Sequence, residues 1–164
     1  MEYEYIIIGC GILAVLYGAV TSKSILSLSA GNERMQEIAA AIQEGATAYL
    51  NRQYMTISLV GVVVAIILGL ALSWTSAIGF VIGAVLSGAA GYIGMVISVR
   101  ANVRTTEASR ESLAAGLSVS FKSGAVTGML VAGLALLAIA GYYFVLIGQY
   151  DVNDANQAKN IIAG

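Results

Sequence analysis

The stretch from Tyr54 to Val99 contains no charged residue. As a single helix it would be about 69 Å long at 1.5 Å per residue, whereas the hydrocarbon core of a bilayer is only ~30 Å thick. The run must therefore fold back on itself, and its one polar interruption is the segment from Ser73 to Ser76. Because this segment includes Trp74, and tryptophan favours the headgroup level, we expect a turn here between two membrane spans.

Two further apolar segments are also free of charge, and the composition agrees with a membrane protein. Hydrophobic residues make up 59% of the 164 residues and charged residues 10%, against about 25% in soluble domains. The first segment follows an acidic start, so we expect a retained span and not a cleaved signal peptide. The sequence predicts an all-α, polytopic protein with a single membrane domain over residues 1–164 and spans at residues 5–22, 55–72, 77–99 and 124–148.

Polar segments separate these spans and are themselves helical in character. Within residues 23–54, Asn32 is the predicted N-cap of an amphipathic helix that continues without a break into the second span. Residues 100–123 contain oppositely charged side chains at helical spacing, and residues 149–164 form a polar tail. The predicted apolar face of the first polar segment comprises Met35, Ile38, Ala39, Ile42, Ala46, Tyr49 and Leu50.

The basic residues lie almost entirely on one side of the predicted spans. Of the eight Lys and Arg residues, seven fall in residues 23–54 and 100–123, and only Lys159 lies on the other side. The positive-inside rule makes the basic side cytoplasmic, so both segments are expected to be cytoplasmic loops. We therefore expect a multi-pass protein of the cell inner membrane with both termini, and the tail, facing outward.

Small residues recur every four positions in the third and fourth predicted spans. Such stripes allow another helix to approach closely. A dimerisation face would use them, but ordinary packing within one subunit is the more frequent role and the one we expect. The stripes consist of Gly79, Gly83, Ser87 and Gly91 in the third span, and of Gly124 and Gly128 in the fourth.

The chain has no histidine, and none of its predicted spans contains an ionisable acid or base, which ion carriers need. Glu37 and Glu44 share a helix face and could bind Mg²⁺, although a solvated face is the commoner role. Arg100 and Arg104 could bind a phosphate, but contact with lipid headgroups is the commoner role of such residues. The single Cys10 lies in an apolar run and is predicted to be buried.

These observations assign no catalytic, cofactor-binding or metal-binding residue to the chain. No basic patch stands clear of the bilayer, so nucleic-acid binding is not expected. Without a family, two functions stay open, a standalone four-helix structural membrane subunit and a small transporter. The charge-free spans count against the transporter.

Three long stretches resemble the membrane-integral inorganic pyrophosphatases. The stretch GNERMQEIAAAIQEGATAYLNRQY is similar to the first cytoplasmic loop of that family, and GAVLSGAAGYIGMVISVRANVRTTEASR to its third helix and following loop. The stretch SFKSGAVTGMLVAGLALL resembles the start of its fourth helix. The similarity runs in order from about residue 31 to residue 137, whereas the first span and the tail match only in hydropathy and position.

The resemblance implies a homodimeric pump that hydrolyses pyrophosphate with Mg²⁺ on the cytoplasmic side and moves H⁺ or Na⁺ outward, with K⁺ as a further cofactor in some members. The Asp- and Lys-rich motifs of this family lie on its fifth, sixth and later helices, so no catalytic residue can be carried over to this chain. We therefore expect the N-terminal portion of such a pump, part of a larger multi-helix bundle. Its expected partners are lipid and the remaining helices, and it is expected to be inactive alone.

Overall fold

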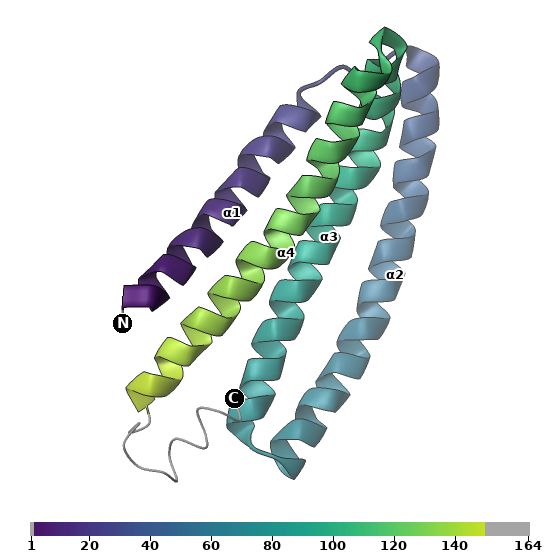
Figure 1. The fold of residues 1–164 in the computed structure, drawn as a ribbon. Helices are drawn as coiled ribbons and strands as arrows, with labels where there is room; N and C mark the ends of the chain where they lie inside the picture. Colours follow the sequence, from purple (N-terminus) through teal and green to yellow (C-terminus); the bar gives the residue numbers. More distant parts are fainter. Residues whose placement is uncertain (1, 150–164) are drawn as a thin grey trace.

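The computed structural model describes residues 2–149, which form four long helices joined by short connections (Figure 1). These are α1 (Glu2–Leu26), α2 (Glu33–Ala71), α3 (Trp74–Glu111) and α4 (Leu113–Gln149). Each is long and apolar enough to cross a membrane, and the described range contains no strand. The predicted all-α architecture with four helices of membrane-spanning type is confirmed. The polar tail, beyond Gln149, lies outside the described residues.

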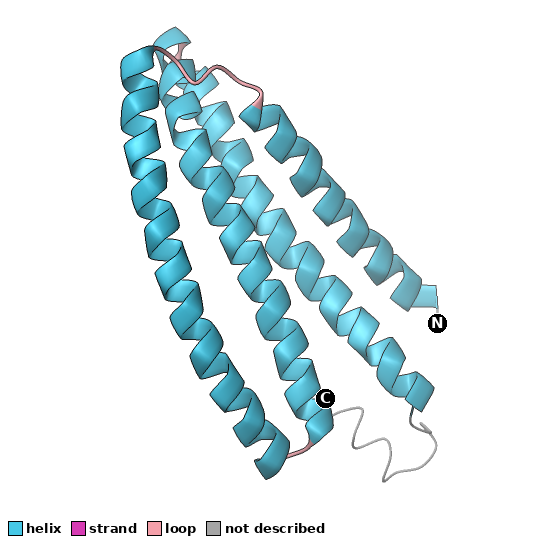
Figure 2. Ribbon diagram, turned by 180° about the vertical axis from the view of Figure 1, so that it is seen from behind, coloured by secondary structure: helices cyan, strands magenta, loops and turns pink. Residues whose placement is uncertain are grey.

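The helices stand side by side in the order α1, α4, α3, α2 (Figures 1 and 2). Contacts between neighbours in this row are extensive, and α1 also touches α3, but within the described range α2 contacts α3 alone. The result is an open row and not a closed four-helix bundle. Large apolar side chains are consequently exposed on every helix.

Helices α2, α3 and α4 are much longer than a bilayer crossing requires. At 1.5 Å per residue, the 39 residues of α2 extend about 58 Å, roughly twice the ~30 Å hydrocarbon core. The polar residues from 33 to 54 continue directly into the apolar part of α2, as the sequence predicted. Residues 100–123 form a tight hairpin that turns at Ser112. The polar segments are therefore extensions of the long helices and not separate loop helices.

Side-chain caps set the helix starts. The Oδ1 atom of Asn32 accepts a hydrogen bond from the backbone N–H of Met35 at 3.0 Å, which confirms the predicted N-cap of α2. The chain reverses at Leu72 and Ser73, where the polar interruption predicted a turn, and the Ser73 hydroxyl accepts from the N–H of Ser76 at 3.1 Å. Each such cap contributes about 1 kcal/mol to helix stability.

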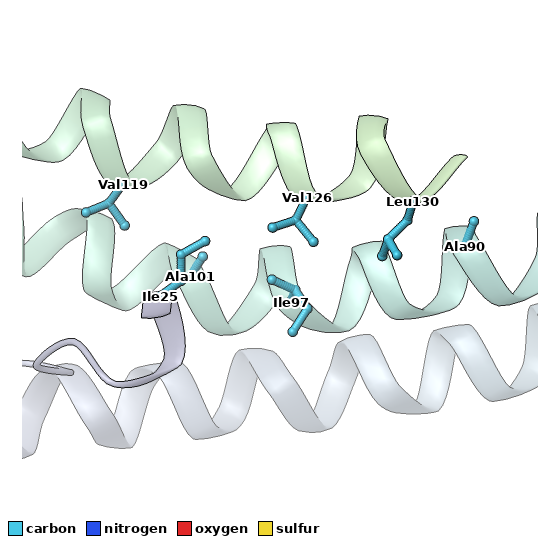
Figure 3. Close-up of a cluster of buried hydrophobic side chains, with 7 residues drawn as sticks. All are labelled: Ile25, Ala90, Ile97, Ala101, Val119, Val126 and Leu130. Carbon is cyan, nitrogen blue, oxygen red and sulfur yellow. The ribbon is translucent and has the colours of Figure 1, made fainter. Parts of the chain in front are cut away.

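A cluster of small and branched apolar side chains is buried where the end of α1 meets α3 and α4 (Figure 3). Most of its members are Ala, Val or Ile, which keeps the helix axes close together. The cluster fixes α3 and α4 as the central pair of the row, with α1 against one side. It consists of Ile25, Ala90, Ile97, Ala101, Val119, Val126 and Leu130.

Helices α1 and α4 approach each other at two glycines that the sequence analysis did not single out. A Cβ atom on Gly133 would lie 2.9 Å from the carbonyl oxygen of Gly11 and 2.9 Å from the Cβ of Ala14. A Cβ on Gly11 would lie 3.1 Å from the carbonyl oxygen of Gly133. Backbone therefore meets backbone at this point, as in small-residue contacts between membrane helices.

The predicted small-residue stripes are not where the described helices pack. Gly83, Gly124 and Gly128 would each place a Cβ atom with no other atom within 4 Å. Gly91 is the exception, because a Cβ there would lie 2.9 Å from the Tyr54 hydroxyl. Packing between the described helices therefore leaves most of these small residues open.

The prediction that Cys10 is buried is wrong, since its side chain is exposed on α1. The contact face of α1 toward α4 is formed by Gly11, Ala14 and Gly18. One residue along an α-helix rotates the side chain by about 100°, so a neighbour of Gly11 points away from that face. An apolar run shows that a segment avoids water, but in a membrane it does not show which side chains are covered by protein.

Candidate functional site

Arg104 on α3 forms the main polar contact between α3 and the end of α1. Its Nη2 donates to the carbonyl of Leu26 at 3.0 Å and its Nε to the carbonyl of Leu28 at 3.2 Å. Its Nη1 donates to the carbonyl of Arg100 at 2.7 Å. The last carbonyls of a helix lack partners within the helix and carry partial negative charge, so a guanidinium there is favoured on both counts.

Arg104 commits most of its donors to the backbone. Three of its five N–H groups, one from each nitrogen, donate to backbone carbonyls, and the side chain of Arg100, one turn earlier, is exposed. The sequence analysis considered these two arginines as an anion site, whereas the structure gives Arg104 backbone carbonyls as partners. The partners of Arg104 indicate that this residue positions the end of α1.

The connection between α1 and α2 lies against the same part of α3. Gly31 has a φ of 76°, in the left-handed region that favours glycine. A Cβ atom there would also lie 2.6 Å from the sulfur of Met35 and 3.0 Å from a carboxylate oxygen of Glu107. Glu107 in turn accepts a hydrogen bond from Arg110 at 2.9 Å. The connection is thus tightly fitted between α2 and α3.

The acidic residues of the described range do not fit a Mg²⁺ site. No group of three or more His, Cys, Asp or Glu side chains among them could hold a metal ion. Glu37 forms an exposed ion pair with Arg34 at 2.6 Å, and Glu44 is exposed two turns further along α2. An exposed pair of this kind contributes at most about 1 kcal/mol, so it serves the helix surface.

Two apolar grooves lie between α2 and α3, and no acid or base lines either of them. The larger, of about 1230 Å³, opens between a contact of Tyr54 with Tyr92 at one end and Trp74 at the other. The Tyr54 hydroxyl donates to the carbonyl of Gly88 at 3.0 Å. The smaller, of about 190 Å³, is lined by Met35, Ile38, Ala39, Ile42, Val99, Asn102, Val103 and Thr106. Neither groove contains groups that could activate a substrate.

The smaller groove contains part of the predicted apolar face of α2, so the prediction can be compared with the structure here. Ala39 and Leu50 are buried, and Ile38 and Ile42 line the groove while keeping part of their surface exposed. Tyr49 is exposed. The face is therefore correctly located in part, and it stays incompletely covered because α2 has a single neighbour in the described range.

Replacing Arg104 by alanine is expected to loosen α1 from the rest of the row. Hydrogen bonds to charged groups contribute about 1.5–3 kcal/mol each, and partial exposure of this site reduces the total to about 2 kcal/mol. For a chain of this size the thermal midpoint in detergent should fall by about 4–8 °C. Arg104→Lys keeps the charge without the planar guanidinium, so its thermal midpoint should lie between those of the parent and of Arg104→Ala. Arg110→Ala, which breaks an exposed pair, should change little; equal midpoints for Arg104→Ala and the parent would contradict the assignment.

The open row of apolar helices defines the class of this protein as a polytopic integral membrane protein. Its family follows from sequence comparison. The chain belongs to the inorganic H⁺ pyrophosphatase family, whose sequence model matches residues 12–164. The resemblance noted in three of its stretches is thereby confirmed.

Relatives of both pump types are similar to this chain. It is 48% identical over 144 residues to a K⁺-insensitive pyrophosphate-energized proton pump of Methanosarcina mazei, an alignment covering 87% of this chain and 21% of the relative. It is 35% identical over 145 residues to a K⁺-stimulated pyrophosphate-energized sodium pump of Thermotoga maritima, covering 85% of this chain and 20% of the relative. The chain thus spans about a fifth of the length of the curated relatives it matches.

Proposed function

We propose that this chain is the N-terminal portion of a pyrophosphate-hydrolysing ion pump, which couples cytoplasmic diphosphate hydrolysis to outward transport of H⁺ or Na⁺. The observation that supports this most strongly is the family match over residues 12–164 in a chain that spans about a fifth of its relatives. Because proton pumps and sodium pumps both match, with and without K⁺ stimulation in their names, the proposal covers either ion.

In this proposal the chain supplies helices and not catalytic groups. Mg²⁺, pyrophosphate and any K⁺ would be bound by helices beyond residue 164, since the described residues do not fit such a site. Lipid and the remaining helices of the pump are the partners, and the complete pump is a homodimer. The open row supports this over a standalone four-helix subunit, because a self-sufficient bundle would enclose a core between its helices.

We further propose that the basic ends of the helices face the cytoplasm and that both termini face outward across the inner membrane. The end of α1 and the turn between α3 and α4 lie at one end of the row, and the turn between α2 and α3 lies at the other (Figure 1). Lys23 is in the last turn of α1, Arg100 and Lys122 are in the parts of α3 and α4 nearer their shared turn, and Trp74 begins α3. This charge asymmetry is the pattern that orients membrane proteins. Residues 1–164 then form one membrane domain with the predicted spans and cytoplasmic extensions.

The parentage is tested by the DNA that follows the codon of Gly164. The reading frame is expected to continue into helices rich in Asp and Lys. A stop codon with no such helices downstream would contradict the proposal directly.

The orientation is tested by thiol labelling in a Cys10→Ser background. A membrane-impermeant maleimide added to intact cells should label Leu72→Cys, at the turn between α2 and α3. Ser29→Cys, in the connection between α1 and α2, should react only after the membrane is permeabilised. The opposite pattern would invert the proposed topology.

A further inference from the structure

Three large apolar side chains stand out on the first turns of α4. Leu113, Leu117 and Phe121 are spaced by four residues, so they share one face of the helix. Their exposed fractions are 84%, 66% and 75%. No described helix covers this face, which points away from the buried contacts of α4 with α1 and α3.

The position of this face along α4 excludes lipid tails as its cover. The charge-free part of α4 begins after Lys122, and Leu117 and Leu113 lie about 10 and 16 Å beyond Gly124 at 1.5 Å per residue. The polar headgroup layer adds only about 5–8 Å on each side of the hydrocarbon core. At least two of these large side chains therefore reach past the lipid, where exposure to water is unfavourable.

The same face continues into the apolar part of α4, where it carries glycines. Gly124 and Gly128 follow Phe121 on this side, and a Cβ on either would meet no atom within 4 Å. Exposed positions in the apolar parts of α1 and α2 carry large side chains such as Leu13 and Leu59. The glycines allow a second helix to approach closely within the membrane, and the apolar side chains from Leu113 to Phe121 offer it a contact surface outside the membrane.

We propose that the face of α4 from Leu113 to Gly128, here called the α4 docking face, binds a helix of the polypeptide that continues beyond residue 164. This inference rests on the proposed function. The matched relatives are four to five times longer than the part that aligns with this chain, so they contain ample further polypeptide to supply the occupant. The occupant is a helix that, like α4, leaves the bilayer on the basic side.

A second copy of this chain is the alternative occupant. A two-fold contact would bring the same surface of each copy together, so it would yield a covalent dimer in the experiment below.

The test replaces Phe121 by the photoreactive residue p-benzoylphenylalanine in the full-length pump encoded by the same reading frame. Illumination is expected to join this position to a peptide from beyond residue 164 without raising the mass above that of one polypeptide. A covalent dimer through Phe121 would identify a second copy and overturn the proposal. Adducts with lipid alone, or no adduct, would overturn it as well. Leu70, exposed on α2, serves as the position that calibrates lipid adducts.

A paired substitution provides a second measurement. Gly128→Leu should lower the thermal midpoint of the full-length pump by several degrees, but it should not lower the midpoint of the 164-residue chain, since the position is open there. Gly148→Leu, also exposed with no atom within 4 Å, is the matched control on the same helix. Tolerance of Gly128→Leu in both proteins would contradict the docking face. If the full-length pump tolerates Gly128→Leu and is active, the docking face is wrong and the proposed function still stands. Failure of the docking face is therefore distinguishable from failure of the proposed function.

Discussion

The 164-residue chain, purified in detergent, is expected to release no phosphate from Mg²⁺-pyrophosphate above background, whereas the proposed full-length pump is expected to hydrolyse it. Phosphoryl transfer is catalysed by metal ions and charged groups that position the phosphates and stabilise the transition state. The described residues present no group of three or more His, Cys, Asp or Glu side chains that could hold a metal ion, and Arg104 donates three of its N–H groups to backbone carbonyls. The expected difference is therefore complete loss and not a reduced rate.

This prediction is measured by phosphate release, with a parallel purification from cells that lack the gene as the control for contaminating phosphatases. Co-expression of the chain with a second polypeptide that begins after residue 164 should restore hydrolysis if the two portions assemble. Activity that stays with the 164-residue chain through purification would refute the assignment of catalysis to later helices. Restored activity in the co-expressed sample shows that the loss arises from missing parts and not from misfolding.

The helices and their turns could be predicted because their signals are local. A charge-free run of known length must cross the bilayer or turn, and Ser73 and Asn32 carry side chains that cap a helix start wherever they lie. The Asn32 cap and the turn at residues 73–76 were located correctly from the sequence, and the structure adds Ser73 as the cap of α3. These features depend on the spacing of neighbouring residues and on the thickness of lipid, which do not change with the tertiary arrangement.

Helix rotation was not predictable in the same way. All sides of a membrane helix are apolar, so hydrophobic periodicity does not identify the packed face. Gly124 and Gly128 have the spacing of a contact motif and are open, whereas Gly11 and Gly133 touch. The outcome depends on which partner each helix meets, and that choice is made by long-range contacts.

The role of Arg104 was hidden for a related reason. In the sequence it has only its helical neighbours, among them Arg100, which suggested a basic pair for phosphate or lipid. Its partners Leu26 and Leu28 are 78 and 76 residues away along the chain. A basic residue near the end of a membrane helix can thus serve the backbone of another helix, and the sequence alone shows the charge without its target.

Gly133→Leu is expected to separate α1 from α4 in the 164-residue chain. Its Cβ would lie 2.9 Å from the carbonyl oxygen of Gly11 and 2.9 Å from the Cβ of Ala14, well inside the 3.5–4.0 Å of favourable contact. The carbonyl belongs to the helix backbone and cannot rotate aside. Overpacking by a few methylenes costs about 1–3 kcal/mol, and a whole leucine side chain against backbone should reach or exceed the upper end.

Separation is measured by cross-linking Tyr5→Cys to Phe144→Cys with a short bifunctional thiol reagent in a Cys10→Ser background, since the two parent rings lie 6.0 Å apart. The pair should cross-link readily in the parent and poorly with Gly133→Leu. Gly128→Leu is the control, because it makes the same replacement five residues earlier with no atom within 4 Å. Both changes gain the same helix propensity, about 1 kcal/mol over glycine. Any difference between them therefore measures the α1–α4 contact, and equal cross-linking would mean that the two backbones do not meet at Gly133.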